Sequence, residues 1–145
     1  MKKQAYTLIG ALVFATMFAF STAKAQSPNQ ELIANVPFEF SAGNQTMPAG
    51  KYTVTVMNPT SDQKTLRIRG LNGKSALLQV HSVNGGTREN ARLVFHRYGT
   101  QYFLAQAWPA ADSIGMEAPR TKAERASELA SNERKIETVA LSRKK

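Results

Sequence analysis

Short runs of alternating apolar and polar residues, rich in β-branched and aromatic side chains, follow one another from Glu31 to Trp108. Gly, Pro and Asn interrupt these runs at intervals of about ten residues, which is typical of strands joined by turns. Because successive side chains of a strand face opposite sides, the alternation predicts an antiparallel, mainly β domain. We expect a single β-sandwich or small barrel of about seven strands.

The first two runs are joined by Met47–Gly50, whose Pro and Gly suit a type I turn. The first run is predicted to place Val36, Phe38 and Phe40 on one face. Pro37 on the opposite face indicates an edge strand, because proline has no N–H to donate. The second run is predicted to alternate between an inward apolar set and an outward threonine pair: Tyr52, Val54 and Val56 inward, Thr53 and Thr55 outward.

The third and fourth runs, 64–69 and 75–81, flank Asn72 and Gly73. A two-residue loop would mix arginines and leucines on one face, whereas a three-residue loop separates them. We therefore predict a type I turn with a G1 bulge over residues 71–73, with Gly73 in the left-handed region. The resulting arrangement pairs Leu66 with Leu78 and Ile68 with Ala76, and it turns Arg67 and Arg69 to solvent.

The segment 91–108 is predicted to form a tight hairpin around Gly99 and Thr100, a composition that suits a type II′ turn. This turn would place Phe95 opposite Leu104 and His96 opposite Phe103. Both faces of the hairpin are partly apolar, so we expect cover on both sides. One face is predicted to carry Leu93, Phe95, Leu104 and Trp108, and the other Val94, Phe103, Ala105 and Ala107.

Beyond Pro109 the composition changes to Ala, Glu, Lys and Arg, and Thr121 to Glu124 have the form of a capping box. We predict a short C-terminal helix at 122–131 and a last strand at about 136–141, followed by a frayed basic tail. Leu129 is the only sizeable apolar residue of this helix, so its packing face is predicted to be thin and its docking weak.

The first 25 residues have the layout of a secretory signal peptide. Lys2 and Lys3 precede an apolar stretch, 8–20, and a small-x-small site ends at Ala25. The apolar stretch is shorter than the roughly 20 residues of a spanning helix. We expect cleavage after Ala25, export to the periplasm or beyond the cell, and no membrane span thereafter. Residues 26–145 are then expected to form a single β domain.

The net charge and the lack of cysteine limit the classes of ligand and of covalent attachment that we expect. Loss of Lys2, Lys3 and Lys24 with the signal peptide lowers the formal charge from +9 to +6, so the domain remains basic. After export the candidate partners are a polyanion of the envelope, a sugar or a lipid. Intracellular nucleic acid is not expected as a partner. The absence of cysteine excludes disulfides, thiolate zinc sites and a lipid anchor on cysteine.

Two surfaces are candidate binding sites. Five of the eight aromatic residues after position 25 lie in the hairpin 91–108; they suit a core, but some could also form a platform for a sugar or apolar ligand. The platform candidates are Tyr98, Tyr102, Trp108 and Arg97. Basic residues of the third strand and its turn suit a solvated face, and they are also candidates for contact with an anion or lipid head group: Lys64, Arg67, Arg69 and Lys74.

The chain shows no pattern of a catalytic or metal site. Its two histidines, His81 and His96, have no ligand spacing around them, and there is neither a thiol nor a nucleophile elbow. Carboxylate pairs such as Glu39 with Glu89 have nothing in the sequence that places them across a cleft. We predict no enzyme, no cofactor and no metal, with a hydrolase kept only as a third option.

Three segments together resemble a family of small exported bacterial proteins of unknown function: ANVPFEFSAGNQTMPAGKYTV, LVFHRYGTQYFLAQAW and GMEAPRTKAERASEL. The resemblance covers nearly all of the chain after residue 25, and it implies no activity, cofactor or site residue. Separately, MPAGKYTVTV is similar to the turn and strand of carboxypeptidase-regulatory-like sandwich modules, which favours a sandwich over a barrel.

The predicted function is that of an exported, non-enzymatic binding or structural module of the cell envelope or secretome. The alternative is a carrier of a lipid or small apolar ligand, enclosed in the cavity of a β-barrel. The two differ in the interior: a module would have a filled core, and a carrier a cavity of several hundred Å³.

Overall fold

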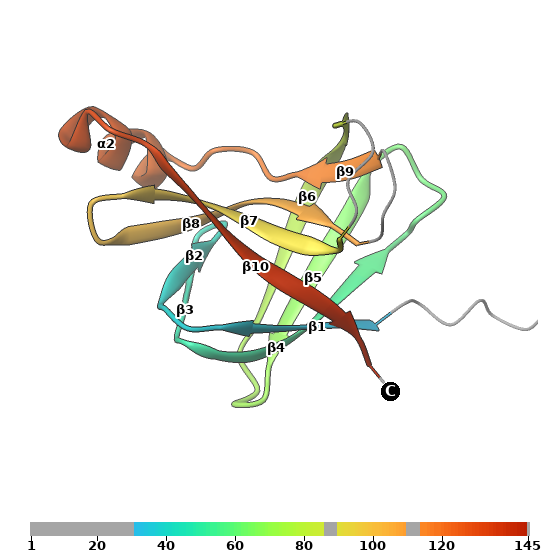
Figure 1. The fold of residues 1–145 in the computed structure, drawn as a ribbon. Coiled ribbons are helices and arrows are strands. Elements are labelled where there is room, and N and C mark those ends of the chain that lie inside the picture. Colours follow the sequence, from blue (N-terminus) through green and yellow to red (C-terminus); the bar gives the residue numbers. More distant parts are fainter. Residues whose placement is uncertain (1–30, 86–89, 110–113, 145) are drawn as a thin grey trace, which may run out of the picture.

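The computed structural model describes residues 31–85, 90–109 and 114–144. The predicted signal peptide, residues 1–25, lies outside the described residues. The described chain forms ten strands and one helix (Figure 1). They are β1 (Glu31–Val36), β2 (Phe40–Ala42), β3 (Gln45–Met47), β4 (Gly50–Met57), β5 (Lys64–Gly70), β6 (Ser75–Asn84), β7 (Arg92–Tyr98), β8 (Gln101–Trp108), β9 (Ile114–Glu117), α2 (Lys122–Ser131) and β10 (Lys135–Arg143).

Eight of these strands form a closed antiparallel barrel. They pair in the order β8-β7-β10-β1-β4-β5-β6-β9, and β9 pairs back onto β8. The short β2–β3 hairpin joins the barrel where Ser41 of β2 lies opposite Phe103 of β8. The mainly β class is confirmed, and of the two architectures predicted the barrel is the one found. The preference for a sandwich is wrong, because one turn and strand do not determine whether a sheet closes.

The first predicted run is divided between two strands. β1 ends at Val36, Pro37 follows it outside the strand, and β2 begins at Phe40. β1 lies between β10 and β4, so the prediction of an edge strand at Pro37 is wrong. Proline has no N–H to donate to a neighbouring strand, so it occurs both on edge strands and just beyond the end of a strand. Here it marks the end of β1.

The β5–β6 hairpin confirms the predicted three-residue loop. Leu66 pairs with Leu78 and Ile68 with Ala76. Gly73 has a φ of 84°, in the left-handed region that a G1 bulge requires. Arg67 and Arg69 therefore alternate with Leu66 and Ile68 and lie on the outer face of the barrel.

The β7–β8 hairpin confirms the predicted turn and its first two pairs, Phe95 with Leu104 and His96 with Phe103. Farther from the turn, the register shifts by one residue, so that Ala105 has no paired residue on β7. Beyond this bulge Leu93 lies opposite Ala107. The prediction that Trp108 shares the face of Leu93 is therefore wrong, because a bulge reverses the side-chain parity of one strand.

Aromatic rings fill the barrel interior beside this hairpin. Phe95 is fully buried, and the centroid of its ring lies 5.1 Å from that of Phe38 and 5.2 Å from that of Phe40. Phe40 meets Tyr52 in the same edge-to-face manner at 5.2 Å. Such pairs add about 0.5–1.5 kcal/mol each to the gain from burial alone.

The helix α2 has the predicted bounds, and Thr121 caps it by accepting a hydrogen bond from the Glu124 N–H at 3.1 Å. Its packing differs from the prediction, because Leu129 is 82% exposed and Glu124 is 3% exposed. The last strand, β10, is longer than predicted: its first part pairs with β7 and its last part with β1. Within the described ranges, no helix has the length and apolar character to cross a membrane.

Candidate anion-binding cleft

Two rows of side chains cross the outer face of β1, β4 and β5. In the first row Glu31 lies opposite Thr55, which lies opposite Arg67. In the second row Thr53 lies between Ile33 and Arg69. Neighbouring strands lie about 4.8 Å apart, so the two threonines and two arginines form one compact set.

This set lines a cleft of about 260 Å³. The turn of the β5–β6 hairpin forms one wall through Gly70, Leu71 and Gly73. The side chains of Glu31 and Lys144 close the other side. The cleft is therefore assembled from three strands, a turn and the C-terminal end of the described chain.

The three cations of the cleft differ in their ion pairs. Lys144 Nζ lies 2.6 Å from Glu31 Oε2, and the Lys144 backbone N–H donates to the Glu31 carbonyl at 3.2 Å. The hydrogen bond and charge of Lys144 hold the pKa of Glu31 below its usual 4.5, and the charges of Arg67 and Arg69 act in the same direction. Within the described residues, neither arginine lies within 4.0 Å of a carboxylate oxygen.

Thr55 adds a buried hydroxyl group to the cleft. Its side chain is 2% exposed, and its Oγ1 has no hydrogen-bond partner among the described residues. Leaving a buried hydroxyl unpaired costs about 1–3 kcal/mol, so most such groups are satisfied by protein, water or a ligand. Among the residues that the structure describes, the Thr55 hydroxyl is thus an unpaired hydrogen-bonding group in the wall of a basic cleft.

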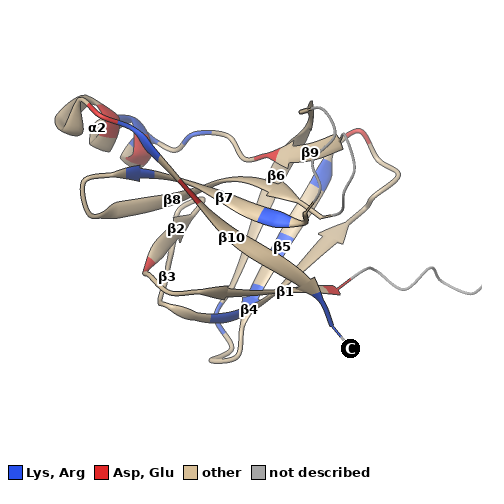
Figure 2. Ribbon diagram, viewed as in Figure 1, with Lys and Arg blue, Asp and Glu red and all other residues tan. Residues whose placement is uncertain are grey.

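The structure brings together two of the four predicted basic residues. Arg67 and Arg69 line the cleft. Lys64 lies on the strand face of Leu66 and Ile68 and donates to Ser82 Oγ at 3.1 Å, and Lys74 lies at the exposed end of the hairpin turn. Figure 2 shows the basic positions on β5, and the acidic start of β1 beside the basic C-terminal end.

The aromatic platform candidates lie in three different surroundings. The Arg97 guanidinium lies 5.4 Å from the ring centroid of Tyr102, which stacks on Phe38 at 3.9 Å. Tyr98 and Trp108 are both buried. Of the four candidates, only Arg97 and Tyr102 contact each other and remain partly exposed.

Trp108 packs against two glycines. A Cβ atom added to Gly115 would lie 2.6 Å from the indole, and one added to Gly85 would lie 2.1 Å from it. The indole Nε1 donates to Gln106 Oε1 at 3.1 Å. These glycines make room for a tryptophan in the wall of the barrel, which explains its burial.

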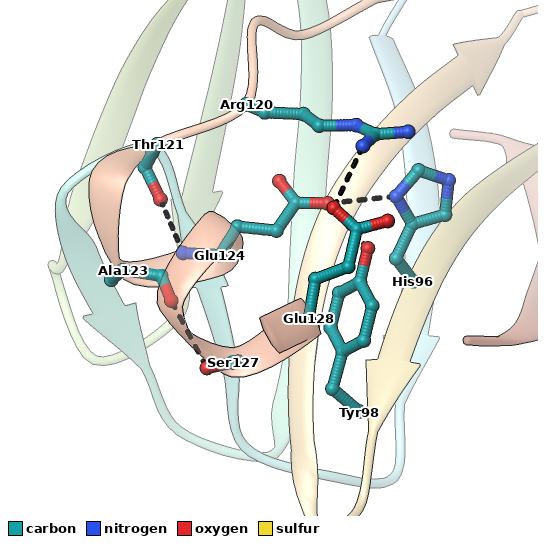
Figure 3. Close-up of polar contacts among 8 residues, drawn as sticks. All are labelled: His96, Tyr98, Arg120, Thr121, Ala123, Glu124, Ser127 and Glu128. Carbon is teal, nitrogen blue, oxygen red and sulfur yellow. Dashed lines mark hydrogen bonds and ion pairs between the residues drawn. The ribbon is translucent and has the colours of Figure 1, made fainter. Parts of the chain in front are cut away.

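A second polar cluster lies beneath α2, between the helix and the outer face of β7 (Figure 3). His96 Nδ1 lies 2.8 Å from Glu124 Oε1, and the Tyr98 hydroxyl donates to the same oxygen at 3.4 Å. Burial raises the pKa of Tyr98 above 10.0, and the nearby Glu124 charge adds to this. At the helix surface, Arg120 pairs with Glu128 at 2.9 Å.

This cluster attaches the helix to the barrel. Glu124 and His96 are only 3% and 9% exposed, so the pair is shielded from solvent by the helix itself. The sequence does not indicate that Glu124 attaches the helix to β7, because Glu124 has the position of the acidic member of a capping box. Across the described part of the chain, no three His, Asp or Glu side chains gather as a metal site.

No family model, curated protein or solved structure matches this chain at a significant level. A function for this chain is therefore proposed below from the chemistry of the cleft.

Proposed function

We propose that this chain is an exported, non-enzymatic binding module that recognises an anionic group of the cell envelope through the cleft on β1, β4 and β5. The observation that carries the proposal is the pair Arg67 and Arg69, which lie side by side in the cleft without a carboxylate partner among the described residues. Guanidinium groups bind phosphate and carboxylate through two parallel hydrogen bonds.

The balance of charge supports an anionic ligand. The cleft holds the cations Arg67, Arg69 and Lys144 and the single carboxylate Glu31. A ligand anion would meet two arginines that form no ion pair with a carboxylate among the described residues. It would also offer an acceptor to the hydroxyl groups of Thr53 and Thr55, which line the same cleft.

The carrier alternative has less support than the outer cleft. Phe95 and Leu104 are buried in the core, and the rings of Phe38, Phe40 and Tyr52 occupy the space beside Phe95. An apolar ligand there would have to displace packed rings, each of which contributes several kcal/mol to folding. A cleft that is already open requires no such displacement.

A hydrolase has less support still. The buried histidine His96 uses Nδ1 to contact Glu124, as a catalytic histidine would, but within the described residues no hydroxyl is hydrogen-bonded to it. The pair also lies beneath α2. Export and kinship with small secreted bacterial proteins remain predictions from the sequence, and both agree with an envelope ligand.

Calorimetric titration with dextran sulfate tests this proposal. We expect binding by the wild-type protein that weakens steeply between 50 and 200 mM NaCl, because bound polyanions release counterions. Changing Arg67 and Arg69 together to Ala should remove most of this binding. The matched control changes Arg125 and Arg134 to Ala, which removes the same charge from exposed positions outside the cleft.

Equal binding by the two double variants would contradict a specific cleft, since net charge alone would then explain the affinity. Saturable uptake of an apolar fluorescent probe, unaffected by the Arg67 and Arg69 changes, would support the carrier instead.

A further inference from the structure

Exposed leucines flank the cleft. Leu71 is 82% exposed at the tip of the β5–β6 hairpin and lines the cleft itself. Leu77 is 65% exposed on β6 and lies directly opposite Arg67. The row Glu31, Thr55 and Arg67 therefore continues into an apolar side chain on the outer face.

The turn does not explain the leucine at position 71. Gly73 supplies the left-handed conformation, and Asn72 accepts a hydrogen bond from the Lys74 N–H at 3.0 Å through its side chain. Leu71 is at the second position of the turn, because the Gly73 N–H donates to the Gly70 carbonyl at 3.1 Å. In a type I turn this position tolerates most residues, including polar ones. Leu71 thus serves neither the core nor the turn, and it lines the cleft together with Arg69.

Cationic groups continue beyond Leu77. A second hollow, of about 550 Å³, lies on its other side and is lined by Arg120 and Lys122 as well as by Leu77. The outer face of β5 and β6 therefore combines exposed leucines with basic side chains. Proteins that lie on anionic bilayers combine these two features, with apolar side chains in the interface and cations at the phosphates.

We propose that the β5–β6 face docks on an anionic lipid surface, with a head-group phosphate in the cleft and Leu71 inserted among the acyl chains. The proposal rests on the anion-binding function above and names its ligand. In this arrangement Arg67 and Arg69 hold the phosphate oxygens, and Thr55 supplies a hydroxyl beside them. Leu77, which lies opposite Arg67 on β6, contacts the lipid surface beside the cleft.

Co-sedimentation with vesicles tests the proposal. The probes are vesicles of phosphatidylcholine alone and vesicles in which phosphatidylglycerol replaces a third of it. We expect binding to the anionic vesicles only, about fivefold weaker for each cation removed at Arg67 or Arg69. Changing Leu71 to Ser should weaken binding by about tenfold, because it removes a buried apolar side chain.

A tryptophan reporter distinguishes insertion from charge attraction. In Leu71→Trp, the new indole should shift its emission to the blue on anionic vesicles. Leu129→Trp is the matched control, because Leu129 is also 82% exposed but lies on α2, away from the hairpin tip (Figure 1). The buried Trp108 contributes the same background to both variants.

Three outcomes separate this inference from the function on which it rests. A blue shift in Leu71→Trp but not in Leu129→Trp, with loss of binding in Leu71→Ser, supports lipid docking. Arginine-dependent binding to dextran sulfate without any vesicle binding overturns lipid docking and leaves the anion site intact. Failure to bind either probe overturns both.

Discussion

At the scale of single residues, the cleft is partly predictable from alternation. The period of two places Thr53 and Thr55 on the outer face, and the three-residue turn places Arg67 and Arg69 there as well. Lys144 was predicted to lie in a frayed tail, and nothing linked it to Glu31, 113 positions earlier. That contact depends on the pairing of β1 with β10, which no local pattern encodes.

The Glu31–Lys144 contact predicts a measurable pKa change. Lys144 is the main cause of the lowered pKa of Glu31, so Lys144→Met should raise this pKa towards 4.5. In wild type, the contribution of Glu31 to stability is present above pH 4.5 and is lost as the pH falls through the lowered pKa. Carboxyl-detected NMR titration of Glu31 measures the change, and Lys135→Met, at an exposed site on β10, is the control. An unchanged pKa in Lys144→Met would contradict the assigned cause.

At the scale of elements, the residues at the turns predicted the structure most accurately. Gly73 and Gly99 each take the positive φ that their predicted turns need, and the registers beside them follow. The bulge at Ala105 was not predictable, because alanine fits a regular strand equally well. Strands of four residues or fewer, β2, β3 and β9, were missed because they are too short to display alternation.

The attachment of α2 is the least predictable feature at this scale, and it yields a stability prediction. Glu124→Gln should destabilise the protein by about 1–3 kcal/mol, because it weakens a buried contact with His96. Glu128→Gln breaks only the exposed pair with Arg120 and should cost about 0–1 kcal/mol. Urea unfolding gives both values, and hydrogen exchange should show faster exchange in α2 for Glu124→Gln alone. Equal effects of the two changes would mean that Glu124 does not anchor the helix.

At the scale of the whole molecule, the fold class followed from composition and alternation, whereas barrel closure did not. Closure requires β9 to join β6 to β8 and β10 to bridge β7 and β1. The pairings of β6 with β9 and of β10 with β7 and β1 connect distant parts of the chain. Closure also determines where a ligand can bind. Aromatic side chains from several strands fill the interior beside β7. The cleft on the outer wall contains Arg67 and Arg69, which have no carboxylate partner among the described residues.

We propose that the outer wall, rather than the barrel interior, binds the ligand. The most direct measurement is a two-dimensional NMR titration with glycerol 3-phosphate, the soluble head group of an anionic phospholipid. We predict saturable shifts concentrated at Thr53, Thr55, Arg67, Arg69 and Lys144, and the loss of these shifts in the Arg67 and Arg69 double variant. Shifts centred on the inner-face residues Tyr52, Phe95 and Leu104, or no saturable shift at all, would contradict it.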